Sequence, residues 1–468
     1  MGQVQRIPYA DMRHRYPIGA GLAVLLAAGC ALYSEVIISP LFLLPSDVTR
    51  TSNSIVDLVE QGDFARAITY GRAIESRPKP LVREFAALGR AELASGRFDQ
   101  ARRHLRTAID LNPSRVQMSE IAWDLSQTEY LANNFAAAEE WSTLAHDMGM
   151  NIRDWHRKYL SALANVDVYR FSGKTSARLP MERKLPRVPR ISVEVNGGTN
   201  ATAVIDSGAV LSIISRRFAT QINVRSLGDF RGTFFGLLGE PIDVTFGLID
   251  SIRIGEMVIH DIPVAIMPDE KLNFFILNRA RFQMDLLLGA NLLKETRMEL
   301  DFRSNHITFQ RLDPSMRRLR PDQNLFFMGF RPFVHATLNR KGWYLFVLDT
   351  GSEITFLNET ELINTSLRGG SKFHGALLQG LGGARKRGAK IENVEIGVDQ
   401  WKGLFKDLPL YSTERSQALG ILGQDFLSNF IVTIDFGAMH VDLRRDQGGF
   451  REPDTGMAAP MGVPRSNR

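Results

Sequence analysis

Cysteine is almost missing from this sequence, in which Cys30 is the single thiol among 468 residues. A chain with one cysteine can form no intramolecular disulfide and no zinc site that needs two or more thiolates. A strong charge of either sign is missing as well, because 57 Lys and Arg against 51 Asp and Glu leave a net charge of +6. That excess is too small and too diffuse to indicate nucleic-acid binding.

The composition argues against several protein classes. Hydrophobic residues make up 44% and charged residues 23% of the chain, which is close to ordinary globular usage. Collagen-like, generally disordered and multi-pass membrane proteins have different compositions. The length predicts about two to four structural units.

Motifs of several metal and cofactor enzymes are missing too. The chain has no His-Glu-x-x-His, no Gly-x-Ser-x-Gly and no EF-hand loop, so metalloprotease and serine-hydrolase chemistry lack support. Gly173-Lys174-Thr175 is no phosphate loop, because Val168 stands where that motif needs a glycine. We expect neither a metal nor a cofactor.

The N-terminal segment, residues 1–44, has the pattern of an export signal. A basic leader with Arg6, Arg13, His14 and Arg15 precedes an apolar run over residues 18–33. Leu26-Ala-Ala-Gly-Cys30 resembles a lipobox, in which the cysteine is lipidated and becomes the mature N-terminus. The alternative is an uncleaved signal anchor that extends to Leu44. Both predict a membrane-attached protein of the bacterial cell envelope that faces the periplasm or the exterior.

Residues 51–165 are rich in Ala, Leu, Arg and Glu and predict helices. Gly62 and Phe64 lie 34 residues before Gly96 and Phe98, and Phe135 lies 37 residues after Phe98. One stretch has the spacings of a tetratricopeptide repeat, namely Leu88, Gly89, Gly96, Phe98, Ala101, Leu105, Ala108 and Pro113. The region resembles an array of about three such repeats. The resemblance implies a groove for a partner protein or peptide, and a helical spacer is the alternative.

Beyond residue 190 the sequence consists of two related halves. In the first, Ile191-Ser-Val-Glu-Val begins a pair of β-rich runs that ends in Ala203-Val-Ile-Asp206-Ser207-Gly208. In the second, Val334-His-Ala-Thr-Leu begins a pair that ends in Phe346-Val-Leu-Asp349-Thr350-Gly351. Each half predicts a hairpin whose second strand delivers an aspartate into a tight turn. The two aspartates are 143 residues apart.

Further blocks repeat in the same order and indicate an internal duplication. Gly236 corresponds to Gly380 at a separation of 144 residues, and Leu287-Leu288-Gly289 corresponds to Ile421-Leu422-Gly423 at 134. His306 and His440 keep the separation of 134, and we interpret them as structural. The predicted segments are a linker at 166–190, lobe 1 at 191–310, a connector at 311–330, lobe 2 at 331–445 and a disordered tail at 446–468.

An Asp-Ser/Thr-Gly turn, a glycine-rich hairpin about 30 residues later and a final apolar-apolar-Gly block resemble the aspartic proteases. The compact spacing is similar to that of retropepsins, and two lobes in one chain are similar to pepsin. The predicted fold class is therefore multidomain α + β. A tetratricopeptide-like helical array precedes a duplicated all-β, bilobal acid-protease domain.

The resemblance implies a role for each block. Asp206 and Asp349 would form one catalytic dyad. Hydroxyls that bond across to the opposite lobe and glycines that permit the sharp turns would support it, at Ser207, Gly208, Thr350 and Gly351. The glycine-rich hairpins would be flaps over a bound peptide, formed by Phe235, Gly236, Gly239, Gly380, Gly382 and Gly383.

This arrangement predicts peptide hydrolysis by an activated water. Two carboxylates about 3 Å apart share one proton, so one can activate water while the other polarises the scissile carbonyl. We expect an aspartic endopeptidase that cuts extended protein segments. The alternative is a catalytically inactive protein whose helical array and barrel only hold peptides. The expected partners are a protein or peptide substrate, a protein at the helical groove and the membrane, and not nucleic acid.

Overall fold

The structure is a computed structural model, and it describes most of the chain beyond residue 53. The described residues are 23–24, 28–29, 36–40, 54–183, 187–236, 239–276, 280–316, 318–320, 322–365, 367, 372–379, 385–411 and 418–445. Among them, no helix is both long and apolar enough to cross a bilayer. The predicted positions Cys30, Gly380, Gly382 and Gly383 and the predicted tail over 446–468 lie outside the described residues.

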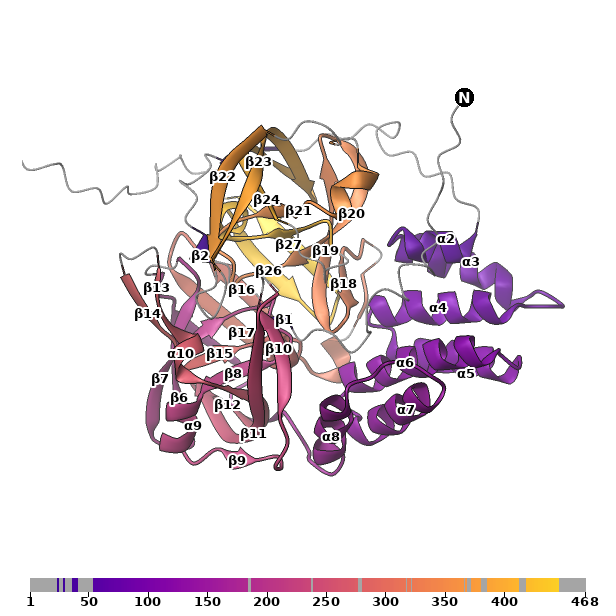
Figure 1. Cartoon of the computed structure of the whole chain (residues 1–468), viewed down its shortest axis with the longest axis horizontal. Coiled ribbons are helices and arrows are strands. Elements are labelled where there is room, and N and C mark those ends of the chain that lie inside the picture. The colour runs from indigo at the N-terminus through magenta and orange to yellow at the C-terminus, as the bar shows by residue number, and fades with distance from the viewer. Residues whose placement is uncertain are drawn as a thin grey trace, which may run out of the picture.

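Helices make up residues 55–163, and the predicted helical array is confirmed (Figure 1). In chain order they are α2 (Ile55–Glu60), α3 (Phe64–Glu75), α4 (Val82–Ala94), α5 (Phe98–Asp110), α6 (Arg115–Leu131), α7 (Phe135–Asp147) and α8 (Asp154–Leu163). Small residues bring neighbouring helices together. A Cβ added at Gly71 would lie 2.3 Å from Cδ1 of Leu88, and one added at Gly89 would lie 2.5 Å from Cγ of Leu105.

Lobe 1 is a closed β-barrel of six strands in the order β11-β6-β7-β15-β8-β12, closed by the β11–β12 pairing. Its strands are β6 (Arg190–Val195), β7 (Thr199–Ile205), β8 (Ser212–Ser215), β11 (Pro241–Ile254), β12 (Met257–Met267) and β15 (Leu286–Leu288). Apolar side chains alternate into the barrel, as Ile191, Val193 and Val195 of β6 do. The hairpin strand β10 (Gly232–Gly236) extends the sheet by pairing with β11.

Shorter elements complete lobe 1. They are α9 (Arg216–Gln221), β9 (Arg225–Ser226), α10 (Asp269–Leu272), β13 (Asn273–Ile276), β14 (Ala280–Gln283) and α11 (Ala290–Leu293).

Lobe 2 repeats the same architecture, and the predicted duplication is confirmed. Its six-stranded barrel runs β19-β20-β25-β21-β24-β23 and closes through β19–β23. The strands are β19 (Arg331–Leu338), β20 (Lys341–Leu348), β21 (Phe356–Asn358), β23 (Arg385–Val398), β24 (Trp401–Tyr411) and β25 (Gly420–Leu422). Around it lie β18 (Leu325–Met328), the turn η3 (Glu361–Asn364), β22 (Lys372–Gln379) and α12 (Gln424–Leu427).

A five-stranded antiparallel sheet joins the lobes. Its order is β27-β26-β16-β17-β5, so a hairpin from each lobe meets at β16–β26. The strands are β5 (Ser176–Pro180), β16 (Thr296–Asp301), β17 (His306–Arg311), β26 (Ile431–Asp435) and β27 (His440–Arg444), and the turn η2 (Pro314–Met316) follows β17. His306 and His440 begin the equivalent strands β17 and β27.

The predicted linker over 166–190 is corrected by the structure. β4 (Arg170–Gly173) pairs with β12, and β5 pairs with β17 along its length. The charged side chains of β5 point outward while Ala177 is buried, so a Lys/Arg-rich composition is compatible with an edge strand. The predicted connector likewise contributes β18, which pairs with β19.

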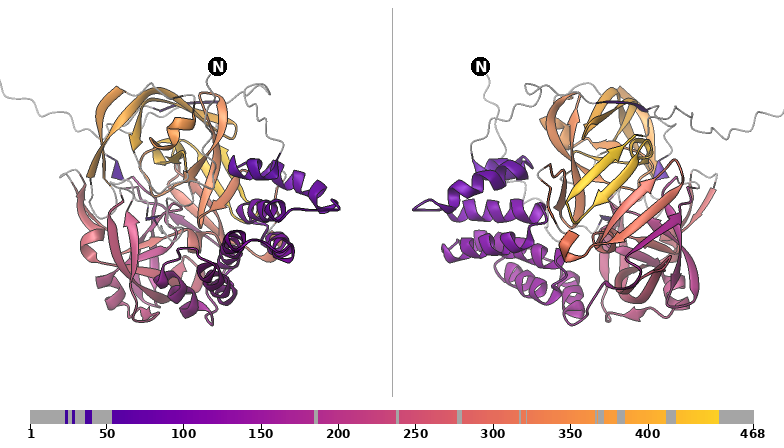
Figure 2. Two further views of the ribbon diagram at one scale, coloured as in Figure 1. Left: turned by 45° about the vertical axis from the view of Figure 1, so that its right-hand side comes forward. Right: turned by 180° about the vertical axis from the view of Figure 1, so that it is seen from behind.

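The helical array packs against both lobes rather than standing apart as a spacer (Figures 1 and 2). Its interhelical turns point at the lobes. A Cβ at Gly62 would lie 2.7 Å from Cδ1 of Leu345, and one at Gly96 would lie 2.9 Å from Cγ of Met439. The Lys294 ammonium donates to Oδ1 of Asn133 at 2.6 Å.

Aromatic side chains that recur in the array hold this interface. Phe64 lies 5.2 Å from Phe326 between ring centroids, and Phe98 lies 6.4 Å from Phe327. Trp155 of α8 stacks on Phe246 of β11 at 5.6 Å. The repeated phenylalanines that identify the array in the sequence thus also bind it to the β-barrels.

Candidate active site

Asp206 and Asp349 follow the inner strands β7 and β20 at equivalent points of the two lobes. The N–H of Asp206 donates to the Leu288 carbonyl at 3.0 Å, and the N–H of Asp349 donates to the Leu422 carbonyl at 3.2 Å. β15 and β25, which carry these carbonyls, are parallel partners of β7 and β20. The apolar-apolar-Gly blocks therefore hold the strand ends that deliver the two aspartates.

The structure brings the two carboxyl groups together at the lobe interface. A Cβ at Gly208 would lie 2.4 Å from Cγ of Asp349, and a Cβ at Gly351 would lie 2.3 Å from Cγ of Asp206. Each glycine thus lies against the carboxyl group of the opposite lobe. Any side chain at either position would displace the facing aspartate, so both glycines are required for space rather than for an unusual φ.

Two hydroxyl groups cross the interface and form a symmetric lattice of hydrogen bonds. The Thr350 hydroxyl donates to the Ile205 carbonyl at 2.8 Å and accepts from the Ser207 N–H at 3.0 Å. The Ser207 hydroxyl donates to the Leu348 carbonyl at 2.6 Å and accepts from the Thr350 N–H at 3.1 Å. Ser207 and Thr350 are both fully buried. The lattice fixes one aspartate turn against the other.

The two oxygens of each carboxyl group have different surroundings. Oδ1 of Asp206 accepts from the N–H groups of Gly208 at 2.9 Å and Ala209 at 3.0 Å, and Oδ1 of Asp349 accepts from the Gly351 N–H at 2.9 Å. Within the described part of the chain, no other group donates to the buried Oδ2 atom of either aspartate. The Oδ2 atoms are therefore the positions where the pair can hold a shared proton.

Burial shifts the ionisation of both aspartates in the same direction. Desolvation raises the pKa of Asp206 to about 7, although the backbone donors of Ala209 and Gly208 oppose it. Desolvation and the charge of Asp206 raise the pKa of Asp349 well above its ordinary value. The pair titrates as one unit and retains one proton at near-neutral pH.

A second ring of duplicated polar residues supports the site, and the sequence reading missed it. The Ser212 hydroxyl donates to Oδ1 of Asn291 at 2.9 Å, and the Thr355 hydroxyl donates to Oδ1 of Asp425 at 2.6 Å. The N–H groups of Gly289 and Gly423 donate to the Ser212 and Thr355 hydroxyls respectively, each at 3.0 Å. Thr355 lies 143 residues after Ser212, and Asp425 lies 134 after Asn291, so the offsets of the duplication could have identified all four.

Comparisons with known proteins match both parts of this architecture. Residues 191–295 match the family model of the gag-polyprotein putative aspartyl protease, and residues 86–145 match a tetratricopeptide repeat model. The chain has an aspartic-protease-like, two-lobed fold behind a tetratricopeptide repeat region.

Solved structures with similar folds include three proteins of low sequence identity. A retropepsin-like aspartic protease from Rickettsia conorii is 14% identical with a TM-score of 0.20, and the match covers 31% of this chain and 96% of that chain. An aspartic proteinase from Irpex lacteus is 11% identical (TM-score 0.34, 58% and 98% covered), and basic 7S globulin from soybean is 9% identical (TM-score 0.33, 57% and 95% covered). No curated protein sequence gives a significant match.

The flap residues of the aspartic-protease-like unit are described in lobe 1. Phe235 and Gly236 end β10, and Gly239 follows with φ +86 in the turn that leads to β11. The Gly236 N–H donates to the Glu240 carbonyl at 2.9 Å. In lobe 2, the equivalent hairpin is formed by β22 and β23. Its predicted glycines stay predictions, because they are not among the described residues.

A buried arginine near the dyad gave no signal in the sequence. Arg331 begins β19 and is 8% exposed. Burial lowers the pKa of its guanidinium to about 10, and the charge of Asp349 acts in the opposite direction. A cation within electrostatic reach favours the ionised form of the dyad. A lone arginine in a β-rich run carries no pattern that could predict this position.

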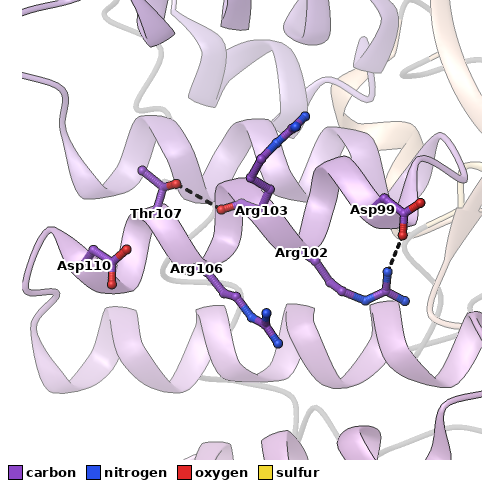
Figure 3. A pocket seen from close by; sticks show the side chains of 6 residues that line it. All are labelled: Asp99, Arg102, Arg103, Arg106, Thr107 and Asp110. Atoms are coloured by element: carbon purple, nitrogen blue, oxygen red, sulfur yellow. Dashed lines mark hydrogen bonds and ion pairs between the residues drawn. The ribbon is translucent and has the colours of Figure 1, made fainter.

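The helical region has a shallow pocket of its own, on α5 (Figure 3). It is lined by Asp99, Arg102, Arg103, Arg106, Thr107 and Asp110. Arg102 is already engaged, because it binds Asp99 at 2.5 Å and Glu129 at 2.7 Å. Among the described residues, His, Cys, Asp and Glu form no group of three or more that could hold a metal ion.

Proposed function

We propose that the protein is an aspartic endopeptidase in which Asp206 and Asp349 are the catalytic dyad. The observation that carries the proposal is the reciprocal contact at the lobe interface, where Gly208 and Gly351 each lie against the opposite carboxyl group. The family match over residues 191–295 supports the same reading. Neither lobe alone contains two facing carboxyl groups, so the duplication builds the site within one chain.

The geometry supports a two-carboxylate mechanism. The ionised member of the pair takes a proton from a water molecule, whose oxygen attacks the scissile carbonyl carbon. The protonated member donates to the carbonyl oxygen and so stabilises the tetrahedral intermediate. Collapse of the intermediate breaks the C–N bond, and the amine leaves with a proton returned by the dyad. The hydroxyl lattice of Ser207 and Thr350 keeps both carboxyl groups oriented throughout.

Amide substitutions test the dyad. Asp206→Asn and Asp349→Asn should each lower kcat about 10³-fold or more, because an amide cannot exchange the shared proton. Asp229→Asn, at an exposed aspartate of lobe 1, is the matched control and should retain full turnover. The measurement is cleavage of a peptide library by mass spectrometry, with circular dichroism to verify folding. Near-normal turnover in either dyad variant would contradict the proposal.

An inactive, peptide-binding protein is the alternative function. It would bind library peptides with the same affinity in the wild type and in Asp206→Asn, without any cleavage. An endopeptidase releases fragments in the wild type and retains intact peptide in the variant.

The envelope location belongs to the same proposal. The basic leader, the apolar run and the Ala-Ala-Gly-Cys30 sequence support lipidation at Cys30. Cys30→Ser should block the lipid modification and accumulate full-length precursor, which mass spectrometry of the N-terminus detects. An intact Met1 on the membrane-bound wild type would favour the signal anchor instead.

A further inference from the structure

Two short strands from the N-terminal segment pair with the two flap hairpins (Figure 1). We call β1 (Ala23–Val24) and β2 (Ala28–Gly29) the leader strands. Ala23 pairs with Phe235 and Val24 with Gly236, in parallel orientation. Ala28 pairs with Gln379 and Gly29 with Leu378, in antiparallel orientation.

The two paired positions are equivalent in the duplication. Gln379 lies 144 residues after Phe235, which is the separation already found between the glycine-rich hairpins. Strands related by a two-fold axis that crosses them run in opposite directions. A single chain that passes across such an axis is therefore parallel to one flap strand and antiparallel to the other. The leader strands show this pair of orientations, as one directional peptide lying across both flaps would.

A third strand holds the leader strands close to the flaps. β3 (Val36–Pro40) pairs antiparallel with β24 from Trp401 to Phe405. Ile38 is 7% exposed, and the Arg445 guanidinium donates to its carbonyl at 3.0 Å. Only residues 30–35 separate β2 from β3 in the sequence. A tether this short gives an effective concentration on the order of millimolar.

The chemistry of the segment suits a strand that binds through its backbone. No charged residue occurs from Tyr16 to Ser34, and the paired residues are Ala23, Val24, Ala28 and Gly29. In strand addition, the main chain supplies affinity and the alternate side chains supply specificity. The two aspartates beneath the flaps are fully buried, so a charged side chain beside them would lose its hydration.

We propose that the leader strands are an intramolecular ligand of the two flap strands and keep the full-length chain latent. The same contacts assign the substrate class, which is extended, uncharged segments with small aliphatic side chains. Latency and substrate class rest on the proposed protease function, whereas the strand pairing itself does not. Cleavage between Gly29 and Val36, which includes the site before Cys30, would separate the leader strands from β3 and release the flaps.

Disulfide trapping in the full-length chain tests the pairing independently of activity. In a Cys30→Ser background, Ala28→Cys is combined with Gln379→Cys, because directly paired residues have the Cα separation of a disulfide. Ala28→Cys with Ser192→Cys, at an exposed position of β6, is the matched control. The first pair should cross-link under mild oxidation and the control should not, as read by peptide mass spectrometry. Ala23→Cys with Phe235→Cys provides a second pair in case one variant misfolds. Equal yields in paired and control variants would overturn the pairing.

Charged substitutions test latency. Full-length Val24→Asp/Ala28→Asp should show a higher kcat/KM on an added peptide than the wild type. A free segment that inhibits at ~0.1 mM slows turnover about 10-fold when tethered at ~1 mM, so we expect activation of about 10-fold. Ala31→Asp, in the same uncharged segment but outside the paired residues, should leave the rate unchanged. Cross-linking without activation would overturn latency, while a chain that cross-links but never cleaves any peptide would instead refute the protease function.

Discussion

The hydroxyl of Thr350 is predicted to be the main stabilising contact between the two aspartate turns. Thr350→Val keeps the shape of the side chain but removes the hydroxyl. The Ile205 carbonyl then loses a donor at 2.8 Å, and the Ser207 N–H loses an acceptor at 3.0 Å. Thr350 and Ser207 are 0% exposed, so we expect no water to replace the lost bonds.

The expected cost follows from these two groups. Each buried backbone group that loses its partner costs ~1–3 kcal/mol, so Thr350→Val should lower the free energy of unfolding by ~2–6 kcal/mol. That is a large part of the ~5–15 kcal/mol typical of a folded protein. The loosened turns should also lower kcat about 100-fold, because a carboxylate displaced by ~1 Å loses its alignment.

The assay is urea unfolding followed by tryptophan fluorescence, together with peptide cleavage. Thr350→Ser retains the hydroxyl and should recover most of the stability and activity. Thr308→Val changes a half-buried threonine of β17 outside the lattice and should cost little. A loss below ~1 kcal/mol in Thr350→Val, or equal damage from Thr350→Ser, would refute the role of the hydroxyl.

Two further predictions concern space and protonation. Gly351→Ala should abolish cleavage, because its Cβ would lie 2.3 Å from Cγ of Asp206, whereas Gly198→Ala, which meets no atom within 4 Å, should be neutral; cleavage assays on both variants decide this. Burial raises the pKa of Glu353 from 4.5 to about 7, so this group binds its proton more tightly in the folded state than in the unfolded state. Its contribution to stability is therefore greatest below about pH 4.5 and falls as the pH rises to about 7. Glu353→Gln should remove this dependence and raise the free energy of unfolding at neutral pH by ~3 kcal/mol. Urea titrations at pH 4.5 and pH 7.5 measure it, and an unchanged pH dependence in Glu353→Gln would contradict the assignment.

The sequence alone determined the duplication and the residues of the central site. Asp206 and Asp349 head equivalent blocks, and a duplicated fold places equivalent residues at equivalent points around its axis. The helical array was predictable for a similar reason, since the recurring Gly-x-Phe spacing reflects packing between neighbouring helices. Both signals are periodic, and a period survives in a linear sequence.

Only the tertiary structure decided which surfaces pair. The predicted linker became β4 and β5 because β12 and β17 offered open strand edges, and backbone pairing depends on the partner edge more than on composition. The docking of Phe326 and Phe327 onto the repeats, the burial of Arg331 and the pairing of the leader strands with the flaps all join residues distant in the sequence. The apolar run at residues 18–33 shows the difference most clearly, because its composition suits a membrane, a signal peptidase or a strand-binding edge alike, and only the partner it meets distinguishes them.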